Sequence, residues 1–128
     1  MARTFKADSS LGESYDDPSE DALFELLADI EEAGDGYLIL SDSVEQQRYV
    51  QTMRTPEGYV LEHRGGGPSS HFGRFIPLDN HSEDRASMRL VHDLMFGWML
   101  ADGDVSGDVR WTSRTDWEPV RLGPGGSP

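Results

Sequence analysis

The chain has 128 residues, carries a formal net charge of −13 and contains no cysteine. This length suits one domain that buries its core without disulfides or metals. The missing thiols exclude a disulfide framework, a cysteine nucleophile and a cysteine-ligated zinc site. The acidic excess argues against nucleic-acid binding, which requires a surplus of Lys and Arg to contact phosphates. No apolar run has the length of a signal peptide or a membrane span, so we expect a cytoplasmic protein that does not contact membranes.

The N-terminal part divides into a predicted tail and a predicted helix. Residues 1–16 are polar and show no hydrophobic period, which predicts a disordered acidic tail. Asp17 can then cap a helix, with Pro18 in its first turn, Glu20 reaching back as in a capping box, and Gly34 at its end. The apolar residues at helical spacing are Leu23, Leu26, Leu27 and Ile30. The acidic residues predicted on the opposite, solvated face are Glu25, Asp29, Glu31 and Glu32.

Four short stretches rich in aromatic and β-branched residues follow this helix and predict strands. They cover residues 36–40, 47–53, 58–64 and 71–77. The short connections between them favour an antiparallel meander. Residues 54–58, RTPEG, predict a tight turn with Pro56 at a favoured position.

A second helix is predicted from about Ser82, its cap, to Ala101. Its apolar stripe comprises Met88, Val91, Met95 and Trp98, widened by Leu94 and Met99. Residues 108–112 and 116–120 are candidate closing strands, and residues 122–128 a disordered end. The order of elements predicts one α+β domain over residues 17–121, an antiparallel sheet meander with the N-terminal helix and the second helix packed on one face.

The sequence RGGGPSS, residues 64–70, separates two of the predicted strands. A phosphate-binding loop would be followed by a helix and would carry a Lys-Ser or Lys-Thr pair, and both features are missing here. Three glycines accept positive φ angles and Pro68 stiffens the exit, so the simpler interpretation is a wide hairpin loop.

Two groups of residues raise the question of metal binding. His63 and His71 flank the glycine loop and could face each other, but a third ligand would be needed, and Glu62 should point to the face opposite His63. Ordinary strand residues are the simpler interpretation. The segment 102–108 resembles the opening of a calcium loop, but its twelfth position falls on Ser113, where a bidentate Glu is required. We therefore expect an exposed acidic turn, no metal and no cofactor.

A longer pattern resembles a known family. It comprises GYLILSDSVEQQRYVQTMRTPEGYVLEHRGGGPSSHF, then a helix containing LMFGWMLADG, then WTSRTDWEPV, over residues 19–121. This pattern is similar to actinobacterial members of the first immunity-protein family of bacterial polymorphic toxin systems. The resemblance implies an α+β fold, no catalytic activity, and the binding and blocking of a cognate toxin domain. In such systems the toxin is often a nucleic-acid deaminase or nuclease.

An acidic inhibitor of this kind would be steered electrostatically to a basic partner. The residues that we expect to contact this partner are Glu25, Asp29, Glu32, Arg64, His71, Asp102, Asp104 and Asp108. Trp98 and Trp117 are expected to belong to the core instead. Two alternatives stay open at this point: an acidic adaptor or regulatory protein that docks on another basic protein, and a small metal-binding protein built around His63, His71 and the Asp-rich turn.

Overall fold

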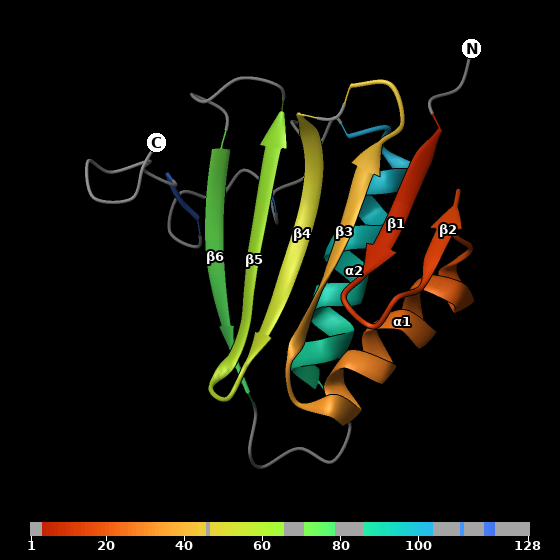
Figure 1. Cartoon of the computed structure of the whole chain (residues 1–128). Coiled ribbons are helices and arrows are strands. Elements are labelled where there is room, and N and C mark those ends of the chain that lie inside the picture. Colours follow the sequence, from red (N-terminus) through yellow and green to blue (C-terminus); the bar gives the residue numbers. More distant parts are fainter. Residues whose placement is uncertain are drawn as a thin grey trace.

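The computed structural model describes residues 4–45, 47–65, 71–78, 86–103, 111 and 117–119, with only the backbone of His71 and Pro119 included. These residues form an α+β fold in which one antiparallel sheet has the strand order β2-β1-β3-β4-β5-β6-β7. Figure 1 shows the sheet in front and both helices behind it, on the same face. The elements are β1 Phe5–Ser9, β2 Ser14–Asp16, α1 Glu20–Ala33, β3 Gly36–Asp42, β4 Arg48–Thr55, β5 Gly58–Gly65, β6 His71–Pro77, α2 Ala86–Leu100 and β7 Glu118–Pro119.

The prediction of a disordered tail is wrong for residues 5–16, which form the β1–β2 hairpin at the edge of the sheet. β1 pairs along its whole length with β3, from Phe5 opposite Asp42 to Ser9 opposite Leu38. Phe5 and Ala7 are buried against the helices. Two alternating apolar residues are too few to reveal a strand in the sequence, and the pairing with β3 supplies the stabilisation that the local pattern lacks.

The start of α1 also differs from the prediction, because Ser19 rather than Asp17 is the N-cap. The Ser19 hydroxyl accepts a hydrogen bond from the Ala22 amide at 3.1 Å. Asp17 has a φ of 46°, and its carboxylate accepts a hydrogen bond of 2.8 Å from the Phe5 amide, which fastens β1 to the start of the helix. Gly34 ends the helix in the left-handed conformation, as predicted.

The four predicted strands are confirmed as β3 to β6, joined in antiparallel order. The predicted turn is also confirmed, with Thr55 opposite Gly58 at the end of the β4–β5 hairpin. The Thr55 hydroxyl accepts hydrogen bonds from the amides of Glu57 and Gly58. Gly58 has a φ of 155°, and a β-carbon there would lie 2.3 Å from the Ile76 carbonyl oxygen, so this position requires glycine.

The core lies between the helices and the sheet. Each predicted helical stripe is buried there, and Trp98 and Trp117, which are 1% and 6% exposed, belong to this core as expected. The sheet contributes the alternate residues Phe5, Ala7, Leu38, Leu40, Val50, Tyr59, Leu61 and Ile76. α2 begins at Ala86 in the described residues, and the expected Ser82 cap lies outside them. β7 confirms part of the second closing strand. In the first, Trp111 is helical, so the prediction of a strand is wrong at that residue, and residues 108–110, 112 and 122–128 lie outside the described part.

Candidate functional site

The candidate site is the face of the sheet that is turned away from the two helices. No described helix or strand covers this face, which we call the open face (Figure 1). The strand register aligns its side chains in three rows that cross the sheet, because directly opposite residues of paired strands share a face. The three rows follow one another along the strands at a spacing of two residues, or about 7 Å.

The first row is apolar and lies toward the β4–β5 turn. Tyr37 of β3 is opposite Met53 of β4, Met53 is opposite Val60 of β5, and Val60 is opposite Phe75 of β6. We call these four residues the apolar row. Tyr37, Met53 and Phe75 are 44%, 53% and 50% exposed, which is unusual for large apolar side chains gathered in one line. Contiguous exposed apolar surface of this kind is typical of interaction sites.

The next row, the central row, consists of Asp8, Ile39, Gln51 and Glu62. The Gln51 side-chain amide donates a hydrogen bond of 2.8 Å to the Glu62 carboxylate, which orients that carboxylate on the open face. A groove of about 380 Å³ lies between the apolar row and the central row. It is lined by Tyr37, Ile39, Gln51, Thr52, Met53, Val60 and Glu62.

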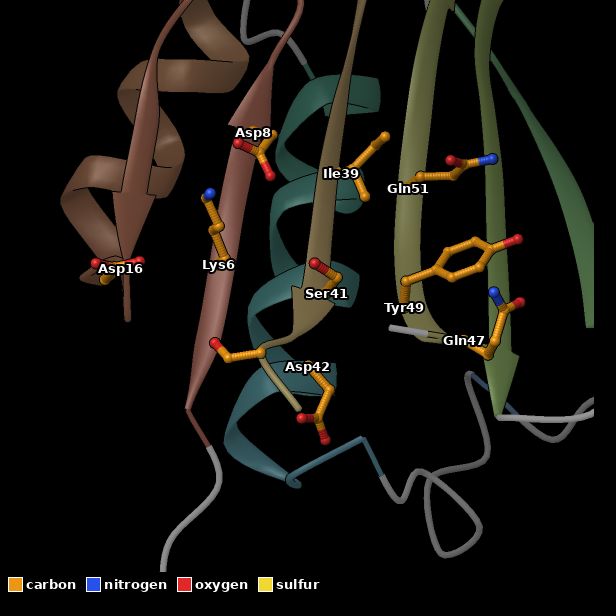
Figure 2. Close-up of a pocket in the computed structure, with 10 residues that line it drawn as sticks. Lys6, Asp8, Asp16, Ile39, Ser41, Asp42, Gln47, Tyr49 and Gln51 are labelled. Atoms are coloured by element: carbon orange, nitrogen blue, oxygen red, sulfur yellow. The ribbon is translucent and has the colours of Figure 1, made fainter. Parts of the chain in front are cut away.

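The third row, the polar row, consists of Lys6, Ser41, Tyr49 and Arg64. A wider hollow of about 750 Å³ lies over this row and part of the central row. Figure 2 shows Lys6, Asp8 and Asp16 on one side of the hollow, and Tyr49 and Gln51 on the other, with α2 behind the sheet. Its lining is therefore mixed in charge, with more carboxylates than cations.

Asp42 also lines this hollow, but its role is structural. It is buried, and its Oδ1 accepts hydrogen bonds from the amides of Val44 at 2.9 Å and Glu45 at 3.1 Å. These bonds stabilise the turn that follows β3. The carboxylates of the hollow that lie farther out are those of Asp8 and Asp16.

The sequence-predicted contact residues do not form one site. Glu25, Asp29 and Glu32 are exposed, as predicted, but they lie on α1, in the helical layer behind the sheet. Arg64 belongs to the polar row on the open face, and the His71 backbone is opposite Arg64 in β6. A single compact partner surface cannot lie flat against both layers.

The predicted acidic turn is described only in part. Asp102 is exposed and has a φ of 54°, directly after α2, and its carbonyl oxygen accepts a hydrogen bond of 3.4 Å from the Arg48 guanidinium. Asp104 and Asp108 lie outside the described residues. The Asp102 turn, Arg48 and Arg64 lie toward the same end of the molecule, where β5 ends and β4 begins (Figure 1).

The idea that His63 and His71 face each other is wrong. The register places His63 opposite Phe72 and His71 opposite Arg64. His63 lies on the helix side of the sheet, within 5.6 Å of the Phe72 ring and 4.9 Å of the rings of Trp111 and Trp117, measured between centroids. Glu62 points to the opposite face, as expected. In the part of the chain that the structure describes, no group of three His, Asp or Glu side chains could hold a metal ion.

A half-buried polar cluster lies between α1 and the β4–β5 hairpin. One oxygen of Glu31 accepts hydrogen bonds of 2.6 Å from the Arg54 guanidinium and of 2.6 Å from the Tyr59 hydroxyl. Burial and the bond to Glu31 raise the pKa of Tyr59 above its ordinary value. Burial alone would lower the pKa of Arg54, but the hydrogen bond and charge of Glu31 outweigh it and raise that pKa. The cluster stabilises the fold, and the placement of Glu31 on the solvated face was wrong.

Comparison with known proteins finds no match among protein-family models, curated proteins or solved structures. The similarity to the immunity-protein family stays a prediction from the sequence pattern.

Neither of the described helices combines the length and the apolar character needed to cross a membrane.

Sequence reasoning missed the apolar row. The signal for it was present in residues 36–40, GYLIL, where apolar residues are consecutive instead of alternating. A strand of that kind has apolar side chains on both faces. Which residues of the other strands join Tyr37 depends on the register, which the sequence alone did not provide.

Proposed function

We propose that this chain is a protein-binding module, and that it is an immunity protein that binds a cognate toxin domain and covers its active site. The class of toxin that the sequence resemblance implies is a nucleic-acid deaminase or nuclease. The role is binding without catalysis, and the partner is a protein with a basic surface.

One observation carries this proposal: the open face presents an apolar row in a chain with a net charge of −13. A sheet face that no described element covers and that carries large exposed apolar side chains is costly for a free protein, and binding of a partner removes that surface from water. The row spans four strands, so its length is about 14 Å. Such an extended, shallow surface suits a protein partner better than a small molecule enclosed on all sides.

The charge supports the choice of partner. Enzymes that act on nucleic acids present basic surfaces to the phosphate backbone. An acidic binder is attracted to such a surface from a distance, which raises the association rate at low salt. The exposed acids of α1, Glu25, Asp29 and Glu32, lie too far round the molecule to share a flat interface with the open face, but they add to this long-range field.

The test is rescue of growth. The candidate toxin is the domain encoded beside this chain's gene, produced in a bacterial host with and without the chain. We expect the toxin alone to stop growth, the pair to grow, and a stoichiometric complex to be recovered from the growing cells. Continued growth arrest in the presence of the folded chain, or rescue without a complex, would refute the proposal.

A further inference from the structure

We propose that the groove beside the apolar row is the docking site for a basic, amphipathic element of a partner protein, whose apolar side chains lie on the apolar row and whose cations lie over the central row. This inference deepens the proposed function and rests on it for the identity of the partner. It specifies the surface, the chemistry of the partner and the spacing of the two kinds of contact.

The apolar contact follows from the exposure of the row. Tyr37, Met53 and Phe75 each leave about half of their surface in water, with Val60 between them. An apolar side chain of a partner that enters the groove of about 380 Å³ would contact Tyr37, Met53 and Val60 at once. Anchors of this type, enclosed by several apolar side chains, contribute most of the binding energy in protein interfaces.

The basic character of the partner follows from the neighbouring row. The Glu62 carboxylate lies at the edge of the groove, held by the Gln51 amide, and Asp8 lies at the other end of the same row. A partner cation placed about 7 Å from the apolar anchor would lie over this row, since that is the distance between alternate residues of a strand. Residues i and i+2 of a strand provide this separation, and residues i and i+4 of a helix, about 5–6 Å apart, come close to it.

The charge also argues against a second copy of the chain as the occupant. Two copies would each contribute a net charge of −13, and wherever their central rows lay against each other, Asp8 and Glu62 of both molecules would be close together. Like charges placed opposite each other across an interface oppose association. A basic partner reverses the sign of the same interaction.

The test uses defined peptides and the full chain. The probe is an amphipathic peptide with leucine and tryptophan on one side and arginine beside them. In one control peptide serine replaces the apolar residues, and in the other glutamate replaces arginine. Binding is measured by calorimetry, and the contact surface is mapped by amide chemical shifts of the labelled chain. We expect shifts in β3, β4 and β5 around the groove, and binding of each control peptide to be at least about tenfold weaker.

Two variants of the chain separate the open face from general acidity. The face variant carries Tyr37→Thr, Met53→Thr and Phe75→Thr, which keep strand propensity and alter only half-exposed side chains. The helix variant carries Glu25→Gln, Asp29→Asn and Glu32→Gln, which remove three exposed charges from α1. We expect the face variant to bind the probe at least about tenfold more weakly, and the helix variant to change the affinity by less than about threefold. Thermal unfolding of both variants verifies that they are folded.

Several results would overturn the inference. If the serine peptide bound as tightly as the probe, net charge alone would attract the probe. The same would follow if the helix variant lost as much affinity as the face variant. Sedimentation of the wild type as a dimer, with the face variant a monomer, would assign the open face to a second copy. Because the growth assay uses no peptide, failure of the immunity function and failure of this docking site can be told apart.

Discussion

Replacement of Glu31 by alanine should destabilise the protein strongly. The change leaves the Arg54 guanidinium and the Tyr59 hydroxyl without their shared acceptor, at 2.6 Å each. Removing one partner of a buried pair costs about 3–5 kcal/mol. The Arg54 and Glu31 side chains keep 10% and 18% of their surface in water, which reduces the expected loss of unfolding free energy to about 2–4 kcal/mol.

This loss is large compared with a total stability of about 5–15 kcal/mol, and it should lower Tm by about 10 °C in a chain of this size. The assay is urea unfolding followed by circular dichroism. The matched control is Glu25→Ala on the same helix, where the acid is exposed and the change should stay within about 0.5 kcal/mol. Equal stability of the two variants would show that the Glu31 cluster is not what joins α1 to the β4–β5 hairpin.

Three further predictions concern stability. The pKa of Tyr59 is raised above the ordinary value of 10.0, so the stabilising effect of this side chain is complete below that pH and is lost as the pH rises beyond it. Urea unfolding at stepped pH should show a shallower alkaline decline of the unfolding free energy for Tyr59→Phe than for the wild type. An identical decline would contradict the raised pKa. Gly58→Ala should cost at least about 2 kcal/mol in thermal unfolding, because its β-carbon would meet a backbone oxygen at 2.3 Å, and clearly more than Gly12→Ala, which meets nothing within 4 Å. Ser19→Ala removes the N-cap of α1 and should cost about 1 kcal/mol by chemical denaturation; no loss would contradict the cap assignment.

The sequence was sufficient for the meander and for the buried stripes of both helices. Those features repeat at a fixed period over several turns or strands, so each residue supports the next. The N-terminal hairpin was not predicted, because only Phe5 and Ala7 of β1 are buried and the strand that pairs with β1 begins some 30 residues later. A short strand that pairs on both sides, as β1 does with β2 and β3, is defined by its neighbours more than by its own pattern.

The candidate site was harder to predict for the same reason. The apolar row joins four strands through their register, and a shift by one residue would move each side chain to the other face. Exposure on α1 was predicted correctly for Glu25, Asp29 and Glu32, since helix periodicity determines it. The half-buried position of Glu31 was not predicted, because its partner Arg54 is 23 residues away in sequence.

The two edge strands of the sheet limit how other chains can bind to it. Among the described strands, the two at the edges are the shortest: β2 has three residues and β7 has two. A foreign strand that paired with β2 or β7 would have few backbone groups to bond with, and β2 also carries Asp16. Short, charged edge strands disfavour uncontrolled growth of a sheet into aggregates, and they offer little backbone for capture of a peptide by strand addition. The docking proposed for the open face therefore depends on side chains, whose identity a mutation can change without altering the backbone of the sheet.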